Sequence, residues 1–348
     1  MTVPPATIFS LPQGRQASMP PEHRGLTRDE VKLLVAGPGG IAHTTFRHLA
    51  DHLESGDVVV VNTSATRPAA IDATWRGKRI TLHLSTHLAG DRWVVELRRD
   101  GGGDPIFDAT AGDRVLLAGG ARAELISPYS EGMKPRLWEA GISTKAPLDA
   151  HMDRHGRPIS YGYVEGSWPL EIYQTVFARP DDPTGASAEM PSAGRPFTPE
   201  LVTTLVSQGI SVVPITLHTG VSSLERDEPP YPERFVVPPA TASAARAARR
   251  RGGRLVAVGT TVTRALETVA DTDGFVWPGE GWTDLVLGPG RPARAVTGLV
   301  TGWHPPEASH LHVLEAVVGA RLVGRAYAAA LAGGYLWHEF GDSCLLLA

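Results

Sequence analysis

Short apolar runs alternate with segments of helical periodicity over both ends of the chain. Runs such as Val58 to Val61 and Leu255 to Val258 are typical of buried strands. After the second run, Val262, Leu266 and Val269 recur at the spacing of one helix face. The pattern predicts strands that end near residues 35, 61, 217, 258, 288, 302 and 347, and helices over 44–53, 199–208, 240–251 and 309–332. Such alternation indicates an α/β fold.

A different pattern extends from about residue 70 to residue 145. Six short strand-like runs follow one another here, at 71–75, 80–84, 93–98, 114–117, 123–126 and 137–140. Turns such as Asp100-Gly-Gly-Gly-Asp104 separate them. Strands at this spacing favour a small β-barrel or sandwich. We therefore predict a mixed α/β main domain, formed by residues 1–69 and 150–348, with residues 70–149 inserted as an all-β, small-barrel domain.

Polar residues stand where four of the predicted strands end. They are Asn62, His218, the stretch Gly259 to Thr261, and the pair Trp303 and His304. Ligands of α/β sheets gather at the carboxyl ends of strands. Four such ends together point to one binding site more strongly than any single one of them does.

The Gly259-Thr260-Thr261 joint is the most informative of these ends. A strand that enters a helix through a glycine leaves free backbone N–H groups and the positive helix end at one point. That point suits a carboxylate or a phosphate, with Arg264 and Glu267 on the following turns. Either threonine hydroxyl is expected to cap the helix. The alternative interpretation is an ordinary strand–turn–helix joint of an α/β fold.

Composition limits the classes of protein to consider. The chain has 348 residues, 42% of them hydrophobic, and a net charge of −4, which argues against a strongly basic nucleic-acid binder. Cys344 is the only cysteine, so no intrachain disulfide is expected. No apolar run reaches the ~18 residues of a membrane span, and residues 1–21 lack a signal-peptide core. We expect a cytoplasmic protein without membrane association, either a monomer or a homo-oligomer.

Several familiar motifs are missing from the sequence. The pairs His48 with His52 and His83 with His87 are weak metal candidates, and no convincing metal spacing accompanies them, so we predict no metal. No Gly-x-Gly-x-x-Gly, Walker loop or Gly-x-Ser-x-Gly elbow occurs. Ordinary dinucleotide, nucleoside-triphosphate and α/β-hydrolase chemistry therefore has no support.

Three features have both a structural and a functional interpretation. The arginine-rich run from Arg246 to Arg254 is typical of a helix end capped by glycines, and the alternative is contact with RNA. His218 and His304 end strands beside turns, where each is either an acid, base or hydrogen-bond donor, or a structural histidine. Trp303 is expected either to cover a flat or cationic ligand or to belong to the core.

Together these segments resemble one known family, the S-adenosylmethionine:tRNA ribosyltransferase-isomerases of queuosine biosynthesis. The most specific block is Val256-Ala-Val-Gly-Thr-Thr-Val262 with Arg264. The other matching blocks, in chain order, are Arg28-Asp29 with Lys32 to Val35, Thr45 to Asp57, Val61-Asn62, Pro68-Ala69, Tyr173 to Ala178, Pro191-Ser-Ala-Gly194 with Phe197-Thr198, Thr216-Leu-His218 with Gly220, His304 with Pro306, and Phe340-Gly-Asp342. These blocks cover nearly the whole chain.

The resemblance implies an α/β domain with an inserted β-barrel. It implies S-adenosylmethionine as the ribosyl donor and the aminomethyl group of a 7-deazaguanine at the tRNA wobble position as the acceptor. The product would be epoxyqueuosine, with adenine and methionine released.

This reaction needs a base for a C5′ proton, because the sulfonium acidifies that carbon, and it needs donors for the methionine carboxylate. Glu233, which matches a family glutamate, and His218 are the two candidates for the proton-handling group. His304 and Arg264 complete the expected catalytic set. The expected substrate-binding residues are Asn62, Arg67, Gln174, Thr175, Pro191, Ser192, Ala193, Gly194, Thr219, Gly220, Gly259, Thr260, Thr261, Glu267 and Trp303.

The sequence departs from the family pattern in loops. A Thr-Arg pair of the family is Ser64-Ala65 here, a family arginine is Ala70, and two family histidines are Pro196 and Tyr231. Loops set specificity on a retained scaffold. Two alternatives therefore stay open: a divergent enzyme that uses S-adenosylmethionine with another small acceptor or only eliminates adenine, and a non-catalytic protein that binds tRNA or a nucleoside.

Overall fold

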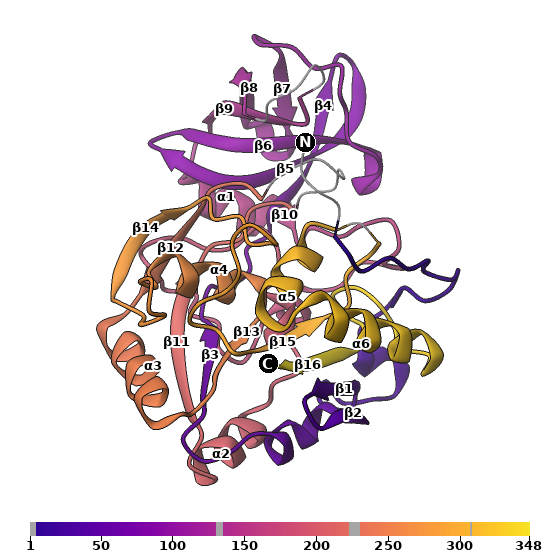
Figure 1. Cartoon of the computed structure of the whole chain (residues 1–348). Coiled ribbons are helices and arrows are strands. Elements are labelled where there is room, and N and C mark those ends of the chain that lie inside the picture. The colour runs from indigo at the N-terminus through magenta and orange to yellow at the C-terminus, as the bar shows by residue number, and fades with distance from the viewer. Residues whose placement is uncertain (1–4, 130–134, 223–229, 307) are drawn as a thin grey trace.

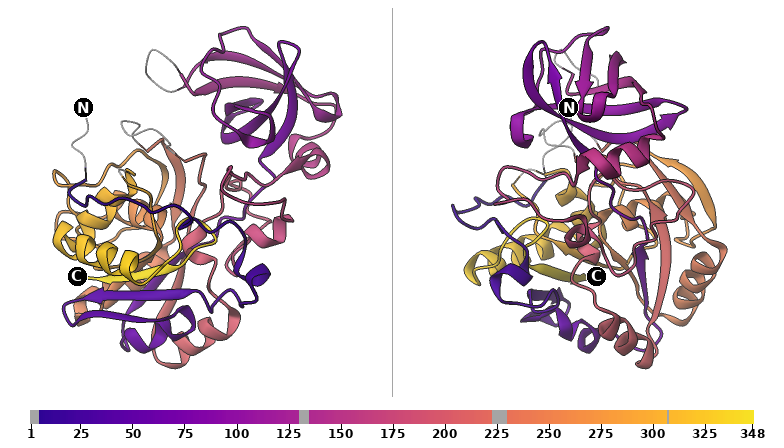
Figure 2. Two further views of the ribbon diagram at one scale, coloured as in Figure 1. Left: turned by 90° about the vertical axis from the view of Figure 1, so that its right-hand side faces the viewer. Right: turned by 180° about the vertical axis from the view of Figure 1, so that it is seen from behind.

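The protein has two lobes, a helix-covered sheet and a β-barrel beside it (Figures 1 and 2). The computed structural model describes residues 5–129, 135–222, 230–306 and 308–348. The larger lobe is formed by both ends of the chain, and the barrel by the segment between them. The fold is therefore the predicted mixed α/β architecture with an all-β barrel, which the chain enters and leaves on the same side.

A nine-stranded mixed sheet forms the larger lobe. Its strands in spatial order are β14 (Gly279–Thr283), β12 (Glu233–Val237), β11 (Ser211–Leu217), β3 (Val58–Asn62), β13 (Leu255–Val258), β15 (Gly298–Gly302), β16 (Ser343–Leu347), β1 (Lys32–Gly37) and β2 (Gly40–Thr45). The four strands β11, β3, β13 and β15 are parallel to one another. Their carboxyl ends consequently meet at one edge of the sheet.

Helices cover both faces of this sheet, which explains the continuous apolar runs. One face packs against α3 (Pro239–Arg251), α4 (Thr260–Thr268), α5 (His310–Val318) and α6 (Ala320–Ala332). The other packs against α2 (Pro199–Ser207) and a 3₁₀ helix, Phe46–His52. In β13, Leu255 and Ala257 join the first core, whereas Val256 and Val258 join the second. Every side chain of this strand is therefore buried.

The second lobe is a closed antiparallel barrel. Its strands are, around the barrel, β4 (Ala70–Trp75), β5 (Lys78–Ala89), β6 (Arg92–Arg99), β9 (Leu137–Ser143), β8 (Arg122–Pro128) and β7 (Arg114–Leu117). Pairing of β7 with β4 closes it. The two-residue strand β10 (Gly156–Arg157) pairs with β4 after the helix α1 (Leu148–His155). All six predicted strand runs are present. The division of the chain into a main domain of residues 1–69 and 150–348 and an inserted domain of residues 70–149 stays a prediction.

Some local predictions were wrong, and each has a physical reason. The segment predicted as a helix over 44–53 is the end of β2 and a 3₁₀ helix, because β2 pairs with β1 through a tight turn at Gly40, whose φ is 112°. The predicted helix over 309–332 is two helices, since Gly319 adopts φ 81° and ψ 145° between them. The segment predicted to be a strand ending at 288 is irregular over residues 284–287, and Leu285 to Leu287 instead line a cavity.

Two strands at one end of the sheet, β12 and β14, were missed by the sequence pattern. They pair with each other and extend the sheet beyond β11. The polar loop expected over 222–233 lies partly outside the described residues, and its last residue, Glu233, begins β12. No helix in the described part of the chain is both long and apolar enough to cross a membrane.

Candidate active site at the carboxyl ends of the parallel strands

A large cavity lies at the sheet edge where the parallel strands end. Its volume is about 870 Å³, within the range of small-molecule sites. The main sheet contributes residues 258–261 after β13 and 301–305 after β15. The barrel side contributes Thr86, Arg98 and Asp104, so the cavity lies between the two lobes. The polar residues predicted at the ends of β13 and β15 therefore meet in this cavity. Thr219 and Gly220, which follow β11, also reach it.

The first turn of α4 opens into this cavity. Gly259 precedes the helix with φ 97° and ψ 156°, a conformation that favours glycine. No threonine hydroxyl caps the helix, contrary to expectation, and the first intrahelical bond runs from the Thr263 N–H to the Gly259 carbonyl. Among the described residues, the N–H groups of Thr260, Thr261 and Val262 have no hydrogen-bond acceptor. The cavity therefore has a helix N-terminus suited to an anion.

Arg264 lies on the next turn of α4 but is fixed by protein acceptors. Its Nη1 donates to the Glu233 carboxylate, and its Nε donates to the carbonyl of Leu285 over 3.0 Å. Its Nη2 donates to the carbonyls of Tyr231 and Thr283 over 3.2 and 3.1 Å. Both partners of this ion pair line the cavity and are largely buried. Burial raises the pKa of Glu233, and the adjacent Arg264 opposes that shift.

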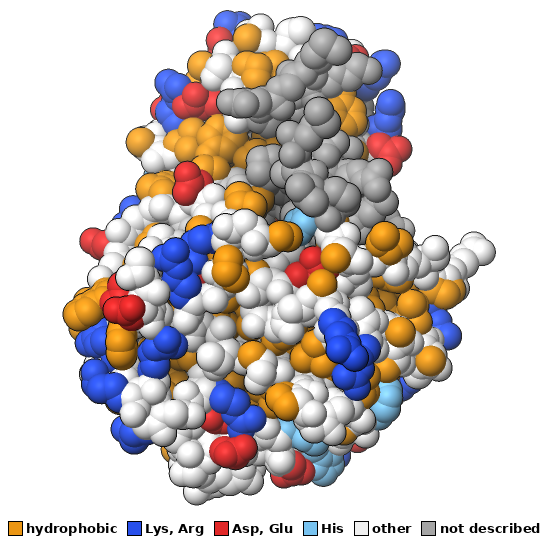
Figure 3. All heavy atoms as spheres, in the orientation of Figure 1, with side chains coloured by type: hydrophobic (Ala, Val, Ile, Leu, Met, Phe, Trp, Pro, Cys, Tyr) orange, Lys and Arg blue, Asp and Glu red, His pale blue; other side chains and the backbone are white. Residues whose placement is uncertain are grey.

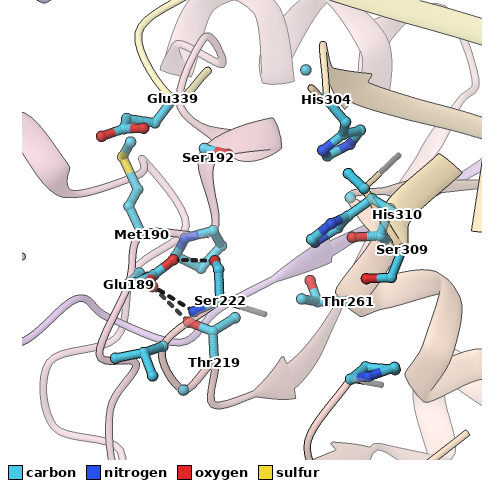
Figure 4. Close-up of a pocket in the computed structure, with 18 of the residues that line it drawn as sticks. Glu189, Met190, Ser192, Thr219, Ser222, Thr261, His304, Ser309, His310 and Glu339 are labelled. Carbon is cyan, nitrogen blue, oxygen red and sulfur yellow. Dashed lines mark hydrogen bonds between the residues drawn. The ribbon is translucent and has the colours of Figure 1, made fainter. Parts of the chain in front are cut away.

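One wall of the cavity is acidic, and no sequence motif predicted it. Glu189 accepts hydrogen bonds from the Tyr161 hydroxyl and from the Ser222 N–H, the latter over 2.9 Å, and its second oxygen accepts from the Ser222 hydroxyl. Glu339 accepts a hydrogen bond from the Tyr163 hydroxyl. Met190 lies between the two carboxylates (Figure 4). Burial raises the pKa of Glu339 to about 7.

Imidazoles form the opposite wall. His304, just after β15, and His310, the first residue of α5, stack with ring centroids 4.6 Å apart and planes 7° apart. The His304 Nε2 lies 3.0 Å from the hydroxyl oxygen of Thr301. Both rings face the carboxylates across the cavity (Figure 4). Burial lowers the pKa of His310 to about 4 and that of His304 well below its usual value, so both are neutral at pH 7.

The buried histidines predict acid sensitivity of the fold. A histidine with a folded pKa near 4 stays neutral in the fold but protonates in the unfolded chain below about 6.5. The contribution of His310 to the free energy of unfolding is therefore fully present above pH 6.5 and is lost as the pH falls toward 4. Glu339 has the opposite effect on the free energy of unfolding. Because the fold raises its pKa, its contribution is lost as the pH rises from about 4.5 to 7.

A variant isolates the histidine contribution. In urea unfolding followed from pH 7 to pH 4, His310→Gln is expected to lose less stability than the unsubstituted chain. Equal losses in the two proteins would show that His310 is not kept neutral by the fold.

His218 lies outside the large cavity. Its Nδ1 is 2.8 Å from the Ser64 hydroxyl and its Nε2 is 2.8 Å from the Thr184 hydroxyl, so both ring nitrogens already have partners. It faces a second, smaller cavity instead. Asn62 is also remote, because its amide bonds the N–H and carbonyl of Leu217 and the N–H of Ser64. Asn62 thus joins the ends of two neighbouring strands.

Other residues expected at the site hold loops in place. Gln174 pairs with the backbone of Thr66 through both amide atoms, and the Glu267 carboxylate accepts three backbone N–H groups of residues 294–296. Thr175 packs against Gly194 and caps the N–H of Phe177. The large cavity is not lined by Gln174, Thr175, Gly194 or Glu267. Pro191, Ser192 and Ala193 do line it, as do Thr219 and Gly220.

Trp303 belongs to the core. Its ring is 1% exposed and packs edge-on against Tyr327 and Tyr335. The residue is part of the wall of the large cavity. A covering role over a ligand, one of the two expected interpretations, therefore has no exposed ring face to support it.

The arginine-rich end of α3 lies on the outside of the sheet lobe. Lys and Arg side chains gather over this region in Figure 3. Arg246 stacks on Trp277 and donates to the Val276 carbonyl, and Arg249 stacks on Phe275. Gly252 ends the helix in the left-handed conformation. Two of these arginines therefore hold the segment that follows α4.

The weak histidine pairs have other partners. His48 bonds Asp51, His83 bonds Glu96 within the barrel, and His87 stacks on Trp93. Within the described ranges, no three His, Cys, Asp or Glu side chains are grouped closely enough to hold a metal ion.

Comparison with known proteins identifies the family. The model of the family described as "Queuosine biosynthesis protein" matches residues 7–346. The chain belongs to this family. Members named S-adenosylmethionine:tRNA ribosyltransferase-isomerase include proteins from Symbiobacterium thermophilum and Moorella thermoacetica, each 34% identical over 97% of this chain and 98% of the relative. The resemblance inferred from the sequence blocks is thereby confirmed.

A solved structure of the queuosine biosynthesis family matches the fold. The crystal structure of an S-adenosylmethionine tRNA ribosyltransferase from Thermotoga maritima is 27% identical and has a TM-score of 0.53. The match covers 98% of this chain and 99% of that one. Both lobes of the present protein are therefore included in the similarity.

Proposed function

We propose that this protein is an S-adenosylmethionine:tRNA ribosyltransferase-isomerase. It moves the ribosyl part of S-adenosylmethionine to the aminomethyl group of a 7-deazaguanine in tRNA, which gives epoxyqueuosine, adenine and methionine. The observation that carries this proposal is the end-to-end match to relatives of that name, 97% of this chain against 98% of theirs. Because the proposed acceptor is tRNA, we also propose a cytoplasmic location.

The charge of the large cavity suits a sulfonium ligand. Glu189 and Glu339 place carboxylates on one wall, and Tyr161 and Tyr163 hold them through their hydroxyls. Opposite charges attract more strongly in a cavity that excludes water than in bulk solvent. The neutral imidazoles opposite add no positive charge that would repel the sulfonium. We propose that the sulfonium lies beside the acidic wall.

The methionine carboxylate fits the N-terminus of α4. The free N–H groups of residues 260–262 point to an anion there, and the partial positive charge of a helix N-terminus favours it. Arg264 supports this site indirectly. It holds the Glu233 carboxylate and the carbonyl of Thr283 against α4. We therefore assign carboxylate binding to the backbone rather than to the guanidinium.

Glu339 is the best-placed group to accept the C5′ proton. Of the two earlier candidates, His218 has no access to the large cavity, and Glu233 is held by Arg264. Glu339 lies in the wall of the cavity with a pKa of about 7, which matches a general base that works near neutrality. Tyr163 orients the carboxylate. Loss of the proton from C5′ would begin the electron shift that expels adenine.

Product analysis tests the proposed function. Incubation of the protein with S-adenosylmethionine and tRNA that carries the 7-aminomethyl-7-deazaguanine base is expected to release adenine and methionine in equal amounts. The same incubation without tRNA, or with tRNA that has guanine at the wobble position, is expected to release neither. Equal release in the absence of tRNA would contradict tRNA as the acceptor and support a small acceptor or simple elimination.

A further inference from the structure

A second cavity lies next to the large one and has a different character. Its volume is about 80 Å³. Thr86 and Thr219 line both cavities, so the two cavities are neighbours that share part of their walls. The wall combines barrel residues of β5 and β6 with His218 and Arg234 at the edge of the main sheet. The small cavity is therefore a second feature of the junction between the lobes.

Arg67 enters this cavity with few partners. Its guanidinium lies over the ring of Trp93, 4.9 Å from the centroid, and its side chain is 13% exposed. Its ion-pair partner in the described structure is Asp149, at 3.5 Å, and that carboxylate is 80% exposed. The Nε–H is buried and has no acceptor among the described residues. Because this Nε–H is closed off from solvent, the Nη groups at the end of the side chain are the donors that can reach a ligand in the cavity.

Arg234 from β12 repeats the same feature. Its Nε–H is also buried without an acceptor in the described part of the chain. His218 lines the same cavity as both arginines. Burial lowers the pKa of that histidine to about 4, Asp182 opposes the shift, and the positive charges of Arg67 and Arg234 add to it. At neutral pH the cavity therefore contains two guanidinium groups beside an uncharged imidazole.

We propose that this small cavity binds one phosphate group of an RNA backbone. Two guanidinium groups in the wall of one small cavity are an arrangement that recognises a phosphate, and the planar fork of arginine matches its oxygens. The cavity has room for a group of that size but not for a nucleoside. Exposed Trp282 and the ring of Trp93 flank it, as is common beside nucleic-acid strands.

The position of the cavity identifies the phosphate. Thr86 and Thr219 line both this cavity and the large one, where the base of the acceptor nucleotide would react. A backbone phosphate beside that nucleotide is therefore the occupant that fits. This assignment rests on the proposed function, because it takes tRNA as the acceptor.

Salt dependence of tRNA binding tests the proposal. The full chain is compared with Arg67→Met, Arg234→Met and the control Arg321→Met, which removes an exposed arginine on α6. Each cavity variant is expected to weaken tRNA binding roughly tenfold at low salt and to reduce the slope of log K against log salt by about 0.7–1. The control is expected to keep the original slope. Affinity for S-adenosylmethionine alone, measured calorimetrically, is expected to stay unchanged in all three and shows that they fold.

Two results would overturn the assignment. One is an unchanged slope of log K for tRNA binding against log salt in both cavity variants. This result would contradict the assignment even if inorganic phosphate bound in the cavity, because RNA would not use the site. The other arises if the unsubstituted protein does not bind tRNA, which would overturn the proposed function itself. In that event, titration of the protein with inorganic phosphate tests whether the small cavity is a phosphate site. Saturable binding that both cavity variants lose would support such a site, and the absence of binding would contradict it.

Discussion

Replacing Glu339 with glutamine is expected to slow adenine release by about 100-fold or more, the usual effect of removing a general base. Glutamine keeps the shape of the side chain and its contact with Tyr163 but cannot accept a proton. Affinity for S-adenosylmethionine should fall much less, because Glu189 remains in the same wall. The rate constant of a single turnover with tRNA in excess is the measurement.

The pH profile separates a base from a merely structural carboxylate. Burial raises the pKa of Glu339 to about 7, so the reactive carboxylate form accumulates as the pH rises through 7. The unsubstituted rate should therefore rise across that region and level off above it, whereas Glu339→Gln should show no such rise. Glu280→Gln, an exposed change on β14, is the matched control and should keep both rate and profile. A Glu339→Gln variant with undiminished rate would exclude Glu339 as the base.

Replacing Arg264 with methionine is expected to destabilise the fold by about 3–5 kcal/mol, the typical effect of leaving one charge of a buried ion pair unpaired. The side chains of Arg264 and Glu233 are 6% and 13% exposed. The change would also remove the donors to the carbonyls of Tyr231, Thr283 and Leu285. Urea unfolding at pH 7 measures the loss, with the exposed Arg321→Met as control.

A double variant assigns this loss to the charge. Arg264→Met combined with Glu233→Gln removes both charges, so it should be more stable than Arg264→Met alone. If the double variant were no more stable than the single one, the loss would come from the broken carbonyl contacts and not from the unpaired carboxylate.

The sequence predicted the parts of the fold that depend on local pattern. Leu255 to Val258 reads as a buried strand because helices cover both faces of the sheet, and the Gly259 break follows directly from its positive φ. The strands β12 and β14 were missed because each has only five residues, and β14 contains two glycines, which are poor strand formers. Residues 285–287 have an apolar pattern but an irregular backbone, since they line the large cavity.

The site was predictable only where it lies on those regular elements. Thr261 and His304 follow strand ends, and both line the cavity. Glu189 and Glu339 come from loops, where no periodicity shows which way a side chain points. The sequence feature that could have pointed to these two glutamates is their position along the chain. Both lie within two residues of the family blocks that begin at Pro191 and Phe340.

His218 shows the converse limit of sequence reasoning. A histidine after a strand is a reasonable candidate for proton transfer. Whether its ring is free depends on Ser64 and Thr184, which are 154 and 34 residues away along the chain. Tertiary contacts of this range leave no local pattern in the sequence.

Tracing the ribose carbons of S-adenosylmethionine into RNA tests the central claim most directly. The protein is incubated with donor labelled in the ribose and with tRNA carrying 7-aminomethyl-7-deazaguanine, and the digested tRNA is examined by mass spectrometry. A labelled wobble nucleoside, formed in the same amount as the released adenine, is the predicted result. Adenine release that leaves the wobble nucleoside unlabelled would contradict ribosyl transfer to tRNA by this protein.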